Sequence, residues 1–263
     1  MEIEIYQLDA FTDKPFGGNP AAVCILPGPA DAEWMQNVAR DMNLPETAFL
    51  YRENNGFHLR WFTPTVEVEL CGHATLASAN VLWESGHVPR GAVIEFYTLI
   101  GTLTAAMNGG MIELDFPSEP EQEATAPPAL TESLGVKPVY VGRNRFDYLV
   151  EVESANEVRG IKPDFELLGT IPVRGVMVTS ASDSPEYDFV SRFFGPASGI
   201  NEDPATGSAH CCLGPYWEKK LGKSEFLAYQ ASERGGVIGV RVMGLRVKLL
   251  GKAVTIFKGV MCV

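Results

Sequence analysis

Two short turns of similar composition contain the residues best suited to chemistry. They are residues 71–75, Cys-Gly-His-Ala-Thr, and residues 206–210, Thr-Gly-Ser-Ala-His. Each turn opens an apolar helix, whose first N–H groups have no intrahelical partner and whose dipole adds partial positive charge. Such helix ends bind anions, so two of them facing each other across a cleft would bind a substrate carboxylate. The plainer alternative is that Gly72 and Gly207 only allow the helices to pack closely.

Four polar side chains in or near these turns are candidates for acid–base work. Glu46 follows Leu-Pro and precedes an apolar run, so its carboxylate would lie at the mouth of a buried strand and suit general acid–base catalysis. His73 ionises near neutral pH and can donate a hydrogen bond or carry a proton. Asp203, in an Asn-Glu-Asp-Pro turn, and Ser208 complete the set. Their alternative roles are structural: Glu46 and His73 as satisfied buried groups, and the other two as caps of backbone N–H groups.

Cys71 directly precedes the first of the two helices, so the helix end is expected to lower the pKa of its thiol and give a reactive thiolate. Thr206 stands at the matching place before the second helix, so the chain lacks a second thiol for a two-base mechanism. An enzyme that uses Cys71 as a base or nucleophile is therefore an alternative to one that uses Glu46.

No cofactor or metal is predicted from the sequence. The five cysteines have no CxxC spacing and the four histidines form no HExxH pattern, which argues against a zinc site. The Gly-Gly pairs at residues 17–18 and 235–236 lack the context of a phosphate-binding loop, so we interpret them as turns. No motif for NAD, ATP or pyridoxal phosphate is found.

The two helices that follow the turns are apolar nearly all round. Residues 74–83 and 209–217 have no polar face, so each helix is expected to be enclosed by other elements. An offset of 135 residues matches Gly72 with Gly207, and an offset of 134 matches a Trp-Glu pair near the end of each helix. This similarity predicts a duplicated domain. Pro215 lies inside the second helix, where we expect a kink or an early stop.

The remaining chain alternates between short predicted strands and turns, which indicates an α+β protein. Residues 117–138 contain five prolines and four glutamates, a composition typical of a linker or an exposed excursion. We therefore predict a first domain over residues 1–116 and a second domain over residues 139–263.

Composition restricts the class of protein. The chain has 263 residues, a net charge of −12 and 46% hydrophobic residues, so it is expected to be globular, and its acidity disfavours nucleic acid and anionic membrane surfaces as partners. The first residues lack the basic start of a signal peptide, and no apolar run approaches the length of a membrane span. Five cysteines in a chain of this length do not resemble a disulfide framework. We expect a cytoplasmic protein.

Several segments together resemble the PhzF-like family of phenazine biosynthesis proteins, whose fold is that of diaminopimelate epimerase. The resemblance extends from Asp9 to about Gly259. The segments that carry it are Asp-Ala-Phe-Thr at 9–12, Phe-Gly-Gly-Asn-Pro-Ala-Ala-Val at 16–23, Glu-Thr-Ala-Phe at 46–49, Arg-Trp-Phe-Thr-Pro at 60–64, Glu-Val-Glu-Leu-Cys-Gly-His-Ala-Thr-Leu-Ala at 67–77, Glu-Asp-Pro-Ala-Thr-Gly-Ser-Ala-His at 202–210, Gln-Ala-Ser at 230–232 and Arg-Gly-Gly at 234–236.

This resemblance implies two similar domains, each a mostly antiparallel sheet or barrel wrapped around a central helix, with the active site in the cleft between them. It also implies a homodimer without cofactor or metal. The best-understood member of the family isomerises dihydro-3-hydroxyanthranilate by moving a proton with one glutamate. By resemblance, the roles fall to Glu46 as that glutamate, to His73, Asp203 and Ser208 as supporting catalytic residues, to Gly72 and Gly207 as carboxylate-binding turns, and to Asn19 as the substrate-binding loop asparagine.

Two departures from the family pattern bear on the substrate. Pro45 stands where some members have a serine that contacts substrate, which leaves the substrate open. Epimerases of this fold use a cysteine from each half, whereas here only Cys71 is present, so racemisation by two thiols is not expected. The sequence thus predicts a cofactor-independent isomerase that shifts a proton on a small carboxylate-bearing substrate. The alternatives are an epimerase that depends on Cys71 and a family member that binds ligands without catalysis.

Overall fold

The computed structural model describes residues 2–262 and divides the chain into two compact units. Unit 1 combines the residues up to Phe116 with those from Leu249 onward, and unit 2 comprises Pro117–Lys248. The chain leaves unit 1 at the end of β8 (Met111–Pro117) and returns to it within β17 (Arg246–Gly251). No helix within residues 2–262 has the length and apolar character needed to cross a membrane.

Unit 1 is a mostly antiparallel sheet in the order β18–β1–β2–β3–β4–β6–β7–β8, with β2–β3 and β4–β6 as parallel pairs. The short strand β5 (Glu67–Val68) also pairs with β4. The other strands are β1 (Glu2–Ala10), β2 (Asn19–Ile25), β3 (Glu46–Glu53), β4 (Gly56–Phe62), β6 (Ile94–Thr98), β7 (Gly101–Asn108) and β18 (Ala253–Cys262).

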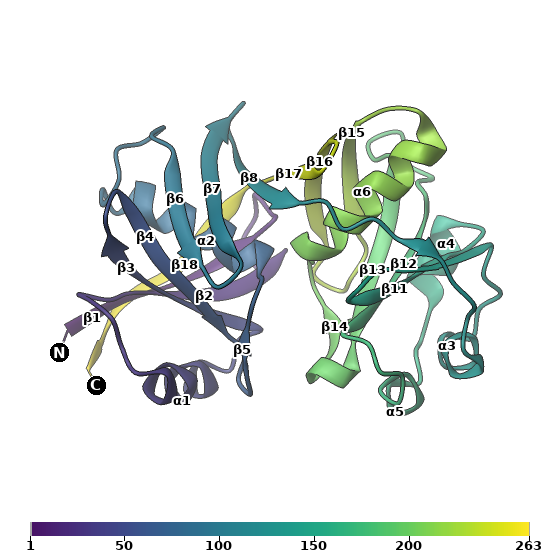
Figure 1. The fold of residues 1–263 in the computed structure, drawn as a ribbon, viewed down its shortest axis with the longest axis horizontal. Coiled ribbons are helices and arrows are strands. Elements are labelled where there is room, and N and C mark those ends of the chain that lie inside the picture. Colours follow the sequence, from purple (N-terminus) through teal and green to yellow (C-terminus); the bar gives the residue numbers. More distant parts are fainter. Residues whose placement is uncertain (1, 263) are drawn as a thin grey trace. The chain divides into compact units, whose positions relative to one another are not determined.

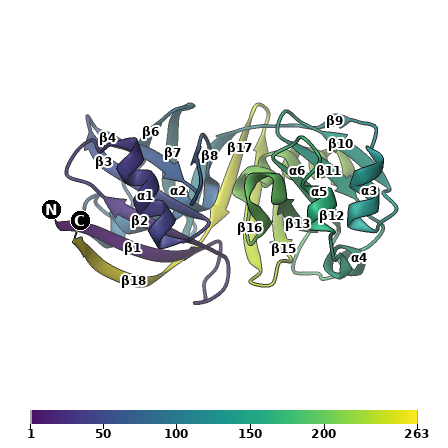
Figure 2. The ribbon, with the colours of Figure 1, turned by 90° about the horizontal axis from the view of Figure 1, so that it is seen from below.

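Helix α2 (Gly72–Glu84) is the centre of unit 1 and packs against β1, β2, β3 and β18 (Figure 1). Eleven of its residues are buried, as expected of a helix with no polar face. Its Thr75 and Ser78 hydroxyls donate to the carbonyls of Cys71 and Ala74, so these polar groups are satisfied inside the core. Helix α1 (Ala32–Met42) is amphipathic and packs only one face on β3 and β4 (Figure 2).

Unit 2 repeats this plan around α6 (Gly207–Leu221), which is buried at ten positions (Figure 1). Its strands are β9 (Gln122–Glu123), β10 (Tyr140–Arg143), β11 (Asp147–Glu151), β12 (Gly175–Ala181), β13 (Phe189–Gly195), β14 (Ile200–Asp203), β15 (Glu225–Gln230) and β16 (Gly236–Met243). Three short helices, α3 (Pro128–Leu134), α4 (Ala155–Gly160) and α5 (Phe165–Leu168), pack around a cluster of buried apolar residues.

The strand pairings of the two units correspond one to one. In unit 1, β1–β2 is antiparallel, β2–β3 parallel, β3–β4 and β4–β5 antiparallel, and β4–β6 parallel. In unit 2, β10–β11, β11–β12, β12–β13, β13–β14 and β13–β15 follow the same sequence of orientations. These shared pairings support the predicted duplication, and the predicted fold of two similar α+β domains, each with a central helix, is confirmed.

A matching ion pair extends the correspondence to side chains. Arg60 binds Glu67 through two hydrogen bonds of 2.6 and 2.7 Å, and Arg192 binds Glu202 through two of 2.7 and 2.8 Å. Each arginine also lies over a phenylalanine two residues further along its own strand. Each pair links a strand, β4 in unit 1 or β13 in unit 2, to the short strand that leads into the central helix, β5 or β14.

The structure differs from the predicted domain boundaries at two places. Residues 117–138 belong to unit 2, because β9 pairs with β10 and Ser118 donates its backbone N–H to the carbonyl of Leu245. The predicted second domain also extends too far, since β18 pairs with β1 along its whole length and belongs to unit 1. Strand pairing between segments far apart in sequence gives no local signal, which explains both differences.

We expected a kink or an early stop at Pro215, and the early stop is wrong, because α6 continues to Leu221. Proline has no N–H to bond the carbonyl four residues earlier, which is that of Cys211. This carbonyl instead accepts the backbone N–H of Glu119, at 3.0 Å. The segment predicted to be a linker thus satisfies the group that the proline leaves open.

Candidate functional site

In unit 1, three predicted site residues meet at the first turn of α2. Asn19 begins β2, Glu46 begins β3 and His73 is the second residue of α2. The Nε2 atom of His73 lies 3.0 Å from Oε2 of Glu46, and its Nδ1 atom lies 3.0 Å from Nδ2 of Asn19. Asn19 and His73 are buried, whereas the Glu46 side chain keeps 13% of its surface exposed. The carboxylate is therefore the member of this group that a ligand can reach.

The surroundings of His73 favour its charged form. Burial disfavours the imidazolium, but the negative charges of a Cys71 thiolate and of the Glu46 carboxylate favour it more strongly, so the pKa of His73 is raised well above 6.5. Asn19 suits either protonation state, because a 180° rotation of its amide exchanges donor and acceptor toward Nδ1. The ring can thus support Glu46 as a carboxylate without a change of position.

Cys71 differs from its prediction. The thiol is buried, and burial followed by the nearby Glu46 charge raises its pKa above the ordinary value of 9.0. The predicted lowering by the helix end is therefore wrong, because desolvation of the thiolate outweighs the helix end and His73. At neutral pH the thiol stays protonated, with Sγ at 3.6 Å from Nδ1 of His73.

Glu46, Cys71 and His73 carry atoms of the types that bind metal ions. One donor atom from each of Glu46, Cys71 and His73 can be chosen so that all three lie within 4.8 Å of one another. However, Glu46 contacts Nε2 of the imidazole while Cys71 contacts Nδ1 on the other side of the ring. One ion bound through one histidine nitrogen would not reach both other donors unless the ring turned. The arrangement does not fit a metal ion as it stands.

In unit 2, the turn before α6 is held by a closed hydrogen-bond network. The Thr206 hydroxyl donates to Asp203 Oδ2 at 2.5 Å, and the Thr206 backbone N–H donates to Oε1 of Gln230 at 2.8 Å. The Gln230 amide in turn donates to the Asp203 carbonyl at 2.7 Å. Asp203 is buried, and these hydrogen bonds hold the segment that leads into α6 at Gly207.

The two predicted carboxylate-binding turns share one feature of helix ends. Gly72 and Gly207 are the first residues of α2 and α6, and neither Cys71 nor Thr206 caps its helix with a side chain. The first N–H groups are therefore not consumed by a capping side chain. This geometry suits an anion at each of the two helix starts.

Arg174 is a residue of this region that sequence reasoning missed. It directly precedes β12 and donates Nη1 to the Ser208 hydroxyl at 3.0 Å. Its Nε and Nη2 bind both oxygens of Asp147, which is fully buried. The duplication offered a signal for this residue. Arg174 directly precedes β12, as Pro45 directly precedes β3, and Pro45 stands where some family members have a serine that contacts substrate.

His210 lies one turn into α6 and, unlike His73, does not contact a carboxylate or a thiol among the described residues. Its Nδ1 donates to the Thr206 carbonyl at 2.8 Å and its ring stacks on Phe189. Complete burial with no charged partner lowers its pKa to about 4. His210 is therefore a neutral core residue at physiological pH.

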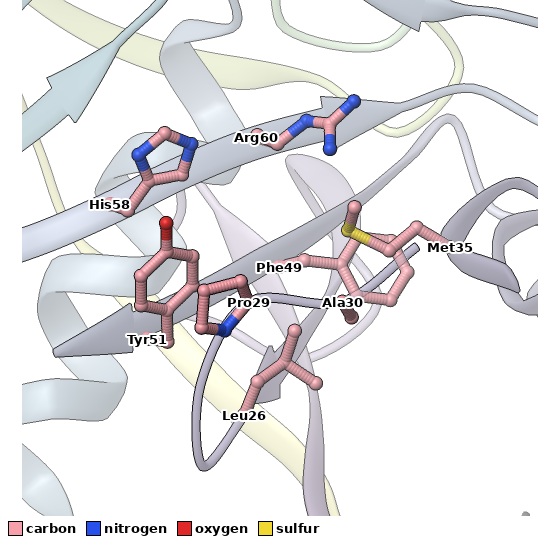
Figure 3. A pocket seen from close by; sticks show the side chains of 8 residues that line it. All are labelled: Leu26, Pro29, Ala30, Met35, Phe49, Tyr51, His58 and Arg60. Atoms are coloured by element: carbon pink, nitrogen blue, oxygen red, sulfur yellow. The ribbon is translucent and has the colours of Figure 1, made fainter. Parts of the chain in front are cut away.

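A further cavity in unit 1 is lined by other side chains (Figure 3). It has a volume of about 50 Å³ and lies between α1 and strands β3 and β4, with Tyr51 stacked on His58 at one side and Met35 at the other. Ligand sites for metabolites are usually several times larger. This cavity has room for a few water molecules, and we assign it no function.

Comparison with known proteins places the chain in a family. The family model described as phenazine biosynthesis-like protein, PhzC-PhzF, matches residues 8–259. The chain belongs to the PhzC-PhzF family. It is 58% identical to an uncharacterized isomerase of Halalkalibacterium halodurans, over 98% of both chains.

Solved structures agree with this family assignment. The crystal structure of a PhzF-family phenazine biosynthesis protein from Enterococcus faecalis matches all of both chains, with a TM-score of 0.94 and 39% identity. A predicted epimerase from Pseudomonas aeruginosa matches 99% of both chains with a TM-score of 0.76, and at 20% identity it shows the fold alone. The predicted resemblance to PhzF-like proteins is thus confirmed.

Proposed function

We propose that this PhzC-PhzF family member is an isomerase that moves a proton on a small, carboxylate-bearing and unsaturated substrate without a cofactor. The observation that carries the proposal is the contact of Glu46 with His73 beside the uncapped start of α2. The name of its relative from Halalkalibacterium halodurans, an isomerase, supports the reaction class.

In the proposed reaction, the Glu46 carboxylate takes a proton from a carbon next to the unsaturated system. The electron pair of the broken C–H bond shifts into that system, and a new C–H bond forms at another carbon when Glu46 returns the proton. The number of protons and electrons on the substrate is unchanged. The imidazolium of His73 stabilises the carboxylate between turnovers and hydrogen-bonds it during them.

Substrate binding is assigned to the two helix starts and their neighbours. Gly72 in unit 1 and Gly207 in unit 2 would each offer backbone N–H groups to a carboxylate, and Asn19, Asp203 and Ser208 are the proposed polar contacts of the substrate. The homodimer and the cytoplasmic location remain predictions from the family and the sequence.

The test is proton NMR in D2O with dihydro-3-hydroxyanthranilate, comparing the wild type with Glu46→Gln. Loss of the acid–base group should slow deuterium entry about a thousandfold. Glu53→Gln is a matched control, because Glu53 lies at the other end of β3 and also contacts a histidine, His58, at 3.2 Å. It should exchange at the wild-type rate. Full exchange by Glu46→Gln would exclude the proposed mechanism.

A further inference from the structure

The geometry points to Arg174 as a specificity-determining residue: with Ser208 it makes the start of α6 select an anionic carboxylate over its neutral amide. This inference rests on the proposed function and names a ligand-recognising group within it. Arg174 Nη1 lies 3.0 Å from Oγ of Ser208, the second residue of α6. The contact joins a strand start to a helix start within unit 2.

The contact decides what the Ser208 hydroxyl can do. A guanidinium only donates hydrogen bonds, so the Ser208 oxygen must accept from Arg174. The hydroxyl proton is then directed away from the arginine and is available for an acceptor. Ser208 is therefore set as a donor, together with the uncapped N–H groups of the same turn.

Arg174 itself retains donor capacity. Its hydrogen bonds to Asp147 and Ser208 use three of the five N–H groups of a guanidinium, which leaves two for a ligand. The arginine side chain keeps 30% of its surface exposed, whereas that of Asp147 keeps 1%. Asp147 thus holds the guanidinium from the buried side and leaves its other edge accessible.

The position of the guanidinium is fixed on its faces as well. The ring centroids of Phe146 and Phe193 lie 5.1 and 5.6 Å from the Arg174 Cζ atom. Cation–π contacts and the two-point bond to Asp147 remove most of the rotamer freedom of the side chain, so little entropy is lost when a ligand binds. The Arg174 N–H groups, the Ser208 hydroxyl and the N–H groups at the start of α6 are all donors, which is the pattern that recognises a carboxylate and rejects an amide NH2.

Arg192 in the same unit shows what a structural arginine looks like. It also binds a carboxylate through two hydrogen bonds, to Glu202, and lies over Phe194. Its Nη1, however, is directed to the carbonyl of Ile161 at 2.7 Å, and only 11% of its side chain is exposed. Arg192 is therefore a matched control for the loss of a buried arginine without loss of the Ser208 contact.

The experiment measures binding of benzoate and of benzamide by NMR, following the backbone N–H of Gly207 and the Nε–H of Arg174. The wild type should bind benzoate and discriminate against benzamide. Arg174→Lys keeps the charge, but a lysine cannot hold Asp147 at two points and also reach Ser208. We expect benzoate binding to weaken about 10- to 100-fold, as for loss of a charged hydrogen bond, with benzamide binding unchanged. Arg192→Lys should leave both affinities as in the wild type.

A second variant guards against misfolding. The pair Arg174→Gln with Asp147→Asn replaces both charges by amides, so no unpaired charge is buried, and it too should lose the preference for benzoate. Thermal unfolding shows that each variant is folded. Retained preference in either Arg174 variant, or no benzoate binding by the wild type, would overturn the inference.

The outcomes separate this inference from the proposed function. Benzoate selection by Arg174 without deuterium exchange on dihydro-3-hydroxyanthranilate would refute the proposed reaction and support the anion site. Exchange that depends on Glu46 with unchanged selection in Arg174→Lys would support the reaction and refute the role of Arg174. In the second case the arginine serves only to neutralise Asp147.

Discussion

In unit 1 the strand beside the central helix begins with Glu46, whereas in unit 2 the matching strand begins with Gly175. The strand registers fix this correspondence, since the next residues, Thr47 and Val176, pair with Phe62 and Phe194 at matching places. A Cβ atom on Gly175 would lie 2.3 Å from the ring of Phe193. Unit 2 therefore has no room for a carboxylate where unit 1 has its candidate base.

The residue directly before each of these strands differs in the opposite sense, because here unit 2 has the functional side chain. Pro45 contributes no donor in unit 1, while Arg174 brings a cation to the helix start in unit 2. The duplication thus preserves the backbone and changes the side chains: the proposed proton-transfer pair, Glu46 and His73, lies in unit 1, and the proposed anion-recognising side chains, Arg174 and Ser208, lie in unit 2. Two units with identical side chains at their helix starts would supply either the acid–base pair or the anion-recognising side chains, and not both.

Loss of the ion pair between Arg174 and Asp147 in unit 2 should have the largest effect on stability. Asp147→Ala removes the fully buried partner of Arg174 and leaves a mostly buried guanidinium unpaired. We expect the free energy of unfolding to fall by about 3 kcal/mol. The matched change in unit 1, Glu67→Ala, breaks a pair in which both side chains are more than a fifth exposed and should cost about 1 kcal/mol. Urea denaturation checks both values, and equal losses would contradict the contrast.

The pKa values of the two histidines near the helix starts, His73 and His210, are shifted in opposite directions. The pKa of His210 is lowered to about 4, so its contribution to stability is present above pH 6.5 and is lost as the pH falls through about 4, by up to about 3 kcal/mol. The pKa of His73 is raised above 6.5, so its contribution is present below pH 6.5 and is lost as the pH rises through the raised value.

Imidazole 15N NMR between pH 3 and 10, with His73→Gln and His210→Gln for assignment, measures both titrations directly. In the wild type, the free energy of unfolding should decrease between pH 6.5 and pH 4 because His210 becomes protonated. This decrease should disappear in His210→Gln and persist in His73→Gln. A His210 that is protonated near its ordinary pKa would show that the core of unit 2 is open to water at this position.

A substitution at Gly175, the position in unit 2 that matches Glu46, tests whether packing excludes a side chain there. Gly175→Ala forces the new methyl group against Phe193 and should lower the free energy of unfolding by about 2 kcal/mol. Gly160→Ala is the control, because no atom lies within 4 Å of the Cβ that it would add. If urea denaturation shows no loss for Gly175→Ala, Phe193 moves aside and the position is not closed to a carboxylate.

The smallest effect is expected at the thiol. Because burial keeps Cys71 protonated, Cys71→Ala should change kcat/KM by less than about tenfold, which corresponds to less than about 1.4 kcal/mol of transition-state stabilisation. Steady-state kinetics on the substrate that shows exchange is the measurement. A loss as large as that of Glu46→Gln would transfer the acid–base role from unit 1's carboxylate to its thiol.

The sequence by itself determined the elements whose signals are local. Apolar residues on all sides of 74–83 and 209–217 required enclosed helices, and the small-residue turns before them fixed where those helices begin. The offset of 135 residues between Gly72 and Gly207 indicated the duplication, and the resemblance to a known family indicated Glu46 as the acid–base residue. The helices and their turns depend only on neighbours along the chain, whereas the duplication and Glu46 required comparison of whole motifs.

Only the tertiary structure decided the properties that depend on distant partners. Pairing of β18 with β1 joins segments from opposite ends of the described chain. Arg174 becomes a candidate ligand-binding group only because Asp147 and Ser208, 27 and 34 residues away, meet it in space. The pKa of Cys71 reverses its predicted direction because enclosure by the sheet removes water from the thiol. Desolvation and long-range pairing arise when the chain closes on itself, so no local pattern of residues records them.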